Sequence, residues 1–229
     1  MKVFKDRLEE IKKGIEEARR RSGWTHEVSV LAVSKRFPVE DIVNAYNTSG
    51  QRQFGENRIQ EALEKAIELN GLAGLEIHFI GHLQTNKVKY LQDHFAMIHS
   101  VDSKRLAELM QEHFAKYDRV QDVLVQVNIA HDVNKSGTTE DEVSAVCGYI
   151  KSCANLRLRG LMMMPPLEDD VEENRKHFRN MRSLFDRLNE KGLGMDVLSM
   201  GMSDDHIIAV EEGSTMVRIG TALFGHREY

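Results

Sequence analysis

Lys35 is a residue whose type and position could support amine chemistry, because it stands just beyond the apolar run Val30–Val33. Lysine is seldom buried, and partial desolvation at the end of a strand lowers the pKa of its amine and makes it a nucleophile. A neutral amine condenses with an aldehyde to give a Schiff base. A surface lysine that begins a loop is the commoner explanation of this spacing, so Lys35 needs support from elsewhere in the chain.

Two segments near the carboxyl end provide that support. Ser199–Asp204 and Arg218–Thr221 combine glycines, which let a backbone approach an oxyanion, with hydroxyl groups that donate to it. Residues 203–210 are typical of a short helix, whose N-terminus favours an anion. A nucleophilic lysine and a phosphate site together predict a ligand with an aldehyde and a phosphate. Pyridoxal 5′-phosphate (PLP) is the ubiquitous compound of that kind.

Alternating strands and helices must position these residues. Short apolar runs, typical of strands in a covered parallel sheet, alternate with seven helical patterns. This order predicts an α/β fold, and eight units of about 25 residues fit a closed (β/α)8 TIM barrel, with an open doubly wound sheet as the alternative. Strand ends then share one rim, where active groups lie. The expected strands are Val28–Ser34, Arg52–Gly55, Glu76–Gly81, Ala96–Val101, Val123–Ile129, Leu158–Met164, Val197–Met202 and Met216–Gly220.

Residues 1–21 predict an extra N-terminal helix. Apolar residues recur there at spacings of three and four, which places Phe4, Leu8, Ile11, Ile15 and Ala18 on one face. We expect this helix to pack on the barrel. The chain shows no linker or break in composition, so a single domain over residues 1–229 is expected. Farther along, Thr139–Glu142 has the pattern of a capping box that begins a helix.

Composition excludes several classes of protein. The 229 residues are 41% hydrophobic and 29% charged, and their 31 basic and 36 acidic side chains give a net charge of −5. This balance offers no electrostatic case for nucleic acid, and no run approaches the ~18 apolar residues of a membrane span. Two cysteines exclude a disulfide scaffold, and ten scattered histidines do not predict a metal site. Without an export signal, we expect a cytoplasmic protein.

Six ordered blocks carry a family resemblance over about residues 35–225. The chain resembles the YggS/PROSC family of pyridoxal phosphate homeostasis proteins, whose barrel is similar to the N-terminal domain of alanine racemase. The blocks are Ala32–Lys35, Phe54–Asn57, His78–Lys87, Gly160–Met162, Leu198–Asp204 and Val217–Thr221.

The resemblance implies a role for individual residues. It implies that Lys35 carries PLP as a Schiff base and that Arg218 faces the pyridine nitrogen. It further implies that the phosphate and the ring are held by two groups of residues: Ser199, Ser203, Gly220 and Thr221 for the phosphate, and Asn57 and Met200 for the ring.

The sequence favours binding over catalysis. Arginine does not give up its proton, so Arg218 would leave the pyridine nitrogen unprotonated and the ring a poor electron sink. Racemisation needs an acid or base on each face of the cofactor. The tyrosines fall in helices or at the C-terminus, which leaves His82 and His131 as candidates. Met162–Met164 is expected to belong to the core.

We therefore expect a PLP-binding protein without robust catalysis, which acts in PLP homeostasis and in supply to PLP-dependent apoenzymes, as the resemblance implies. A PLP-dependent racemase-like enzyme and a cofactor-free phosphosugar enzyme with a Schiff-base lysine are the alternatives. A monomer is the simplest expectation. No role is assigned to Glu56, His82 or the pair Lys87 and Lys89.

Overall fold

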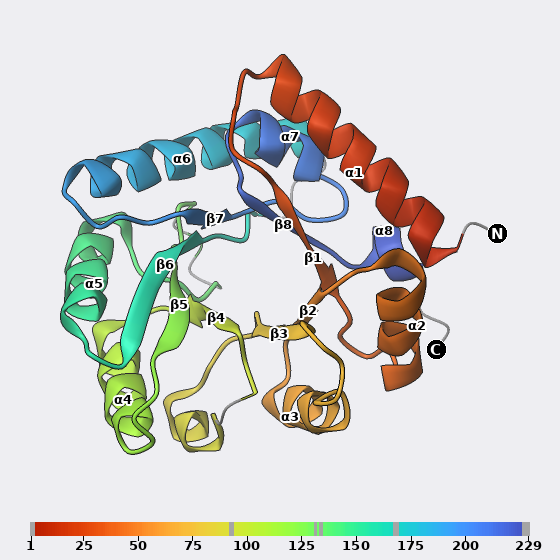
Figure 1. Cartoon of the computed structure of the whole chain (residues 1–229). Helices are drawn as coiled ribbons and strands as arrows, with labels where there is room; N and C mark the ends of the chain where they lie inside the picture. The colour runs from red at the N-terminus through yellow and green to blue at the C-terminus, as the bar shows by residue number, and fades with distance from the viewer. Residues whose placement is uncertain (1–2, 92–93, 131, 133–134, 167–169, 226–229) are drawn as a thin grey trace.

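Eight parallel strands close into a barrel in the computed structural model, which describes residues 3–91, 94–130, 132, 135–166 and 170–225. Each strand pairs with its neighbours in the sequence, and β1 also pairs with β8 (Figure 1). The strands are β1 Ser29–Val33, β2 Gln53–Glu56, β3 Glu76–Phe79, β4 Met97–Val101, β5 Gln121–Gln126, β6 Leu156–Met162, β7 Val197–Ser199 and β8 Met216–Ile219.

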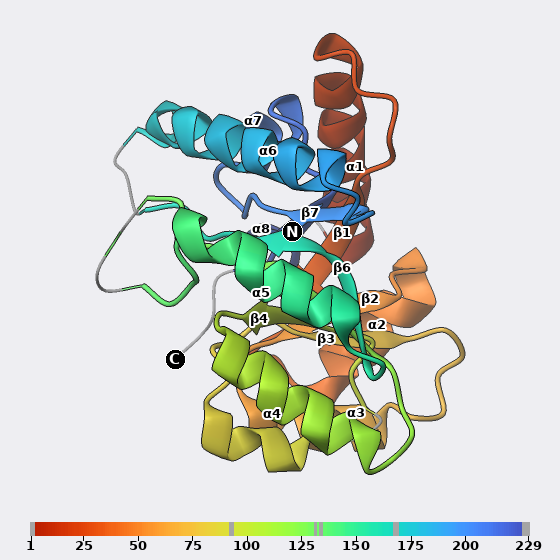
Figure 2. The same ribbon diagram turned by 90° about the vertical axis from the view of Figure 1, so that its left-hand side faces the viewer.

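Helices surround the barrel, and α4, α5 and α6 run side by side along one flank (Figure 2). The helices are α1 Phe4–Arg21, α2 Val39–Ser49, α3 Ile59–Glu68, α4 Lys104–Ala115, α5 Glu140–Ser152, α6 Asn174–Glu190, α7 His206–Glu211 and α8 Thr221–Phe224, and the 3-10 helices are η1 Thr85–Tyr90 and η2 Val171–Glu173. None of the helices in the described ranges is long and apolar enough to cross a membrane.

The predicted TIM barrel is confirmed, and all eight predicted strands are present with small differences at their ends. The strand predicted at Val197–Met202 ends at Ser199, and the one predicted at Leu158–Met164 begins at Leu156 and ends at Met162. The connection between β3 and β4 holds the 3-10 helix η1, where Lys87 and Lys89 lie, instead of a full α-helix.

The apolar core has two parts. The larger part fills the space between the strands and the helices, and it includes the predicted inner face of α1, in which Leu8, Ile15 and Ala18 are buried. The smaller part lies inside the barrel and consists of Leu31, Met97, Leu124, Met162, Val197 and Met216. Polar side chains share the barrel interior with this smaller part of the core.

The helix α1 covers the α7 and α8 side of the barrel (Figure 1). Phe4 packs on Phe224 with ring centroids 5.0 Å apart, and the indole nitrogen of Trp24 donates to the Glu211 carbonyl at 3.0 Å. These contacts confirm the expectation of a helix packed on the barrel.

The predicted capping box is wrong in its detail. Thr139 does stand at the N-cap of α5, but its side chain caps no backbone N–H. The Thr139 hydroxyl instead donates to Glu142 Oε2 at 3.1 Å. The hydrogen of the hydroxyl is thus given to a charged acceptor, and the two side chains pair with each other at this exposed position.

We predict that Gly160→Ala destabilises the barrel by about 3 kcal/mol or more, because an added Cβ would lie 1.7 Å from the Val197 carbonyl oxygen where β6 meets β7. Gly148→Ala is the control, since a Cβ there meets nothing within 4 Å on the exposed side of α5. We expect the control to gain about 0.5–1 kcal/mol from helix propensity. Urea unfolding measures both, and a Gly160→Ala protein as stable as the control would contradict the register of these strands.

Candidate functional site

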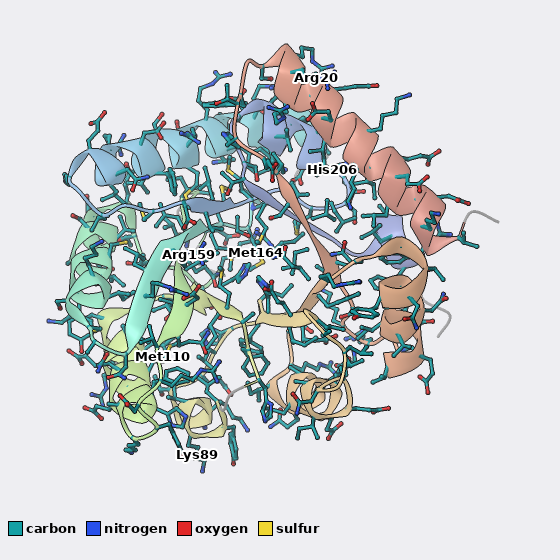
Figure 3. All side chains as sticks on the ribbon, in the orientation of Figure 1. Arg20, Lys89, Met110, Arg159, Met164 and His206 are labelled. Carbon is teal, nitrogen blue, oxygen red and sulfur yellow. The ribbon has the colours of Figure 1, made fainter. Side chains whose placement is uncertain are left out.

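A cavity of about 490 Å³ opens at the carboxyl ends of the strands. This is the end of the barrel where ligands bind in this fold. The side chain of Met164, one of its lining residues, lies near the centre of the barrel in the view down its axis, whereas Arg20 and Lys89 lie outside (Figure 3). The cavity is lined by Val33, Lys35, Asn57, Ile80, Gly81, His82, Met164, Met202, Ser203, Asp204, Arg218, Gly220 and Thr221.

Six of the eight predicted site residues therefore lie on one cavity, namely Lys35, Asn57, Ser203, Arg218, Gly220 and Thr221. Ser199 and Met200 do not line it, and both are fully buried. A larger groove of about 640 Å³ lies outside the barrel among α1, α2 and α8, and it shares only Thr221 with the residues predicted for the site.

Lys35 lies in a tight turn that follows β1. The amide of Ser34 continues the strand pairing by donating to the Gly55 carbonyl at 3.0 Å, and Phe37 N donates back to the Ser34 carbonyl at 3.0 Å. Between them, Arg36 has a φ of 64°, in the left-handed region that a residue with a side chain seldom adopts. Lys35 is half-buried within this turn.

Asn57 follows β2, and a close approach of two backbones holds it in place. A Cβ at Gly81 would lie 2.0 Å from the Asn57 carbonyl oxygen, so only glycine permits this contact. The amide of Ile80 also donates to the Glu56 carbonyl at 2.8 Å. The ends of β2 and β3 therefore position Asn57 jointly.

Arg218 on β8 is a buried cation with neutral partners. Its Nη1 donates to the carbonyl and hydroxyl oxygens of Ser199 at 2.9 and 2.8 Å, and its Nη2 donates to the Met163 carbonyl at 2.7 Å. Burial lowers the pKa of Arg218 to about 10, against the opposing charge of Asp205, so the guanidinium is still a cation at neutral pH. The described partners of its guanidinium are thus two carbonyl oxygens and one hydroxyl oxygen, all of them uncharged.

A hydrogen-bonded chain of polar groups leads from Arg218 into the barrel interior. The Ser199 hydroxyl accepts from Arg218 and lies 3.4 Å from His99 Nδ1, and His99 Nε2 lies 2.9 Å from His78 Nδ1. Burial, followed by the charges of His78 and Arg218, lowers the pKa of His99 well below its usual value, so this ring is neutral. The hydroxyl has a second lone pair, so it donates to Nδ1 or accepts from it according to the tautomer of His99, and that tautomer also sets the direction of the bond between His99 and His78.

The β7–α7 and β8–α8 loops supply the hydroxyl groups predicted for a phosphate. Ser203 Oγ accepts from the amide of Ala222 at 3.3 Å, which joins the two loops. That bond leaves the hydroxyl hydrogen of Ser203 available to an anion in the cavity. Asp205 anchors the first loop by accepting from the amide of Met202 at 2.6 Å.

The prediction for Met162–Met164 is confirmed for two residues and wrong for the third. Met162 and Met163 are fully buried, whereas Met164 is 40% exposed and lines the cavity. Met202, 37% exposed, was also missed. Strand β6 ends at Met162, so Met164 stands on the rim; the signal for this was its place at the end of an apolar run.

His82, one of the two candidate acid or base groups, does line the cavity. Its side chain is 52% exposed, and Nδ1 lies 3.4 Å from Asp102 Oδ2 at the neighbouring strand end. The other candidate, His131, lies outside the described residues.

Comparison with known proteins places this barrel and cavity in a family. Residues 7–228 match the family model described as "Alanine racemase, N-terminal domain". Curated relatives named "Pyridoxal phosphate homeostasis protein" include one from Aquifex aeolicus, 42% identical over 98% of both chains, and one from Escherichia coli, 39% identical over 97% of this chain and 96% of that protein. The chain therefore belongs to the pyridoxal phosphate homeostasis proteins, within the alanine racemase N-terminal domain family.

Solved structures agree with this assignment. The structure of PipY from Synechococcus elongatus, described as having PLP bound, superposes with a TM-score of 0.85 at 36% identity and covers 97% of this chain and 100% of that chain. An alanine racemase from Clostridium difficile superposes with a TM-score of 0.74 at 15% identity over 95% of this chain and 60% of its own. At that identity the racemase shares the fold alone.

We predict that Ser199→Ala lowers the free energy of unfolding by about 1–3 kcal/mol, because it removes the hydroxyl between buried Arg218 and His99. Ser203→Ala is the matched control, since Ser203 is only part-buried and its hydroxyl accepts a single backbone bond. We expect the control to lose less than about 1 kcal/mol in urea unfolding. Equal losses in the two variants would mean that Ser199 does not support Arg218.

Proposed function

We propose that this chain binds PLP reversibly through Lys35 and acts in the homeostasis and supply of PLP inside the cell. The observation that carries the proposal is that Lys35 and Arg218 line one cavity, together with the hydroxyl-bearing loops at its edge. The names of the curated relatives and the PLP-bound PipY structure support the identity of the ligand.

The residues fit the chemical groups of PLP. The primary amine of Lys35 would hold the aldehyde through a C=N bond, whose formation releases one water and whose hydrolysis restores both groups. Ser203, Gly220 and Thr221 provide hydroxyl and backbone groups for the phosphate at the edge of the same cavity. When bound, PLP would supply an electrophilic carbon and a conjugated ring.

Arg218 fits the pyridine nitrogen because the described acceptors of its guanidinium are neutral. It remains a hydrogen-bond donor at neutral pH, so it would present a donor to an unprotonated ring nitrogen. That arrangement makes the ring a weaker electron sink. It therefore favours binding of the cofactor and disfavours catalysis on amino acids. Ser199 would then serve the ring nitrogen indirectly, by holding Arg218.

We predict that borohydride reduction of the protein with PLP, followed by peptide mass mapping, places a pyridoxyl group on Lys35. Lys35→Ala should lose the label, and Lys12→Ala, which changes an exposed lysine of α1, should retain it. A label that remains on another lysine of Lys35→Ala at the wild-type level would overturn the assignment.

The His82–Asp102 contact favours one alternative, a racemase-like enzyme, since a histidine at the rim could serve as the second acid or base. Against it, the His82 side chain is half-exposed and Nδ1 stands 3.4 Å from its carboxylate. A loosely held, solvated imidazole is a poor device for directed proton transfer. We propose that the chain has no robust catalytic activity.

The decisive measurement is exchange of the α-hydrogen of amino acids in D₂O with the PLP-loaded protein. We predict exchange no faster than with the same concentration of free PLP, for wild type and for His82→Gln alike. Protein-dependent exchange that His82→Gln abolishes would establish the racemase-like alternative and assign the histidine its role.

A further inference from the structure

A buried ammonium group lies directly behind Lys35. Lys65 on α3 is 6% exposed, and its Nζ donates to the Ser34 carbonyl at 2.9 Å, to Glu56 Oε1 at 2.7 Å and to Glu61 Oε1 at 2.8 Å. These three acceptors match the three hydrogens of the ammonium group. We call Lys65, Glu56, Glu61 and Ser34 the Lys65 cluster.

The Lys65 cluster holds the backbone on both sides of Lys35. On one side, Lys65 binds the Ser34 carbonyl directly, while the Ser34 hydroxyl donates to Glu56 Oε1 at 2.7 Å. On the other side, the amide of Arg36 donates to Glu61 Oε1 at 2.6 Å. Both peptide segments that flank Lys35 are therefore tied, directly or through one carboxylate, to the same ammonium group.

The conformation of the turn explains why it needs such a support. Arg36 has a φ of 64°, which a residue with a Cβ adopts at a cost, so the turn would relax if its hydrogen bonds were lost. The Arg36 amide is one of those bonds, and Glu61, on which it depends, is positioned by Lys65 one turn farther along α3. Relaxation of the turn would redirect the side chain of Lys35.

The Lys65 cluster contains one ammonium group and two carboxyl groups, and the two carboxyl groups differ in their surroundings. Glu56 is fully buried, and burial raises the pKa of its carboxyl group, although Lys65 and Ser34 donate to it. Its Oε2 has no hydrogen-bond partner among the described residues. For Glu61, burial is outweighed by the hydrogen bonds from Lys65 and from the Arg36 amide, which lower the pKa of this carboxyl group. An ion pair needs only one carboxylate. Lys65 instead donates to two carboxylates and to a backbone carbonyl, so it joins three groups around the turn of Lys35.

We propose that Lys65, acting through Ser34 and Glu61, is a positioning residue that aims the amine of Lys35 into the cavity. This inference rests on the proposed function, in which Lys35 binds the aldehyde of PLP. The cluster touches the turn after β1 and does not line the cavity, so it affects the covalent bond to Lys35 and not the sites for the ring and phosphate.

Two ligands distinguish an effect on the covalent bond to Lys35 from an effect on the sites for the ring and phosphate. PLP requires both the cavity and a correctly aimed amine, whereas pyridoxine 5′-phosphate, in which an alcohol replaces the aldehyde, requires the cavity alone. Glu61→Ala removes the acceptor of the Arg36 amide at a part-exposed position, and Glu61→Gln keeps an amide oxygen there. We expect Glu61→Ala to weaken PLP binding about tenfold, with Glu61→Gln within about threefold of wild type.

Pyridoxine 5′-phosphate should bind wild type and both variants alike, to within about twofold. Calorimetry measures both ligands, and borohydride labelling of Lys35 under a fixed PLP concentration gives an independent readout. The same loss for both ligands, or unchanged PLP binding in Glu61→Ala, would overturn the positioning role.

A second variant tests Lys65 itself without leaving a buried charge unpaired. Lys65→Met combined with Glu56→Gln removes both charges of the buried pair, and Lys13→Met combined with Glu17→Gln makes the same changes in an exposed pair of α1. We expect about a tenfold or greater loss of PLP affinity in the first protein and none in the second.

Labelling of the wild-type protein distinguishes a failure of the proposed function from a failure of the positioning role alone. Absence of a pyridoxyl group on wild-type Lys35 would overturn the proposed function and this inference with it. Normal labelling of wild type, together with unchanged PLP binding in Glu61→Ala or in the Lys65→Met and Glu56→Gln double variant, would overturn only the positioning role.

Discussion

The pairing of β1 with β8 is the constraint on which the site depends. Residues Ser29 to Ala32 pair in parallel register with Met216 to Ile219, which joins the first and last strands of the sheet. Without this pairing, Lys35 and Arg218 would stand at opposite edges of an open sheet. Closure places them on one rim and also leaves neither strand with an unpaired edge.

The same closure explains how much of the molecule could be predicted from its sequence. Strands that helices cover on their outer face are apolar runs, so all eight could be predicted from the sequence. The residues at their ends included Lys35, Asn57 and Arg218, which line the cavity. The residue at which each strand ends was harder to predict. β7 ends at Ser199, earlier than predicted, and leaves Ser199 bound to Arg218 inside the barrel.

A similar difference of two residues in β6 placed Met164 on the rim, although the apolar run that contains it predicted core. Side chains alternate between faces of a strand, so the direction of each depends on local backbone geometry that composition does not report. The Lys65 cluster was beyond sequence reasoning for another reason. Lys65 and Glu61 follow the ordinary spacing of an exposed helical ion pair, and only tertiary packing buries Lys65 against Glu56.

Two buried cations, Lys65 and Arg218, are accommodated in different ways. Lys65 has two carboxylates and a carbonyl as partners, whereas the described partners of Arg218 are neutral oxygens. An ammonium ion is strongly hydrated and needs charged partners on burial, while the delocalised guanidinium is more weakly hydrated and can be satisfied by carbonyl groups. The first lies behind the turn of Lys35, and the second borders the cavity.

The chain of groups from Arg218 through Ser199 and His99 to His78 begins at an arginine that can only donate. The Ser199 hydroxyl has two lone pairs, so it can accept from Arg218 while it either donates to His99 or accepts from it, and the two imidazole rings can change tautomer together. The other acceptors of the guanidinium, the carbonyl oxygens of Ser199 and Met163, carry no hydrogen that could rearrange. The arginine is therefore anchored independently of the tautomers behind it, and a change of tautomer in the barrel interior leaves its position at the cavity unaltered.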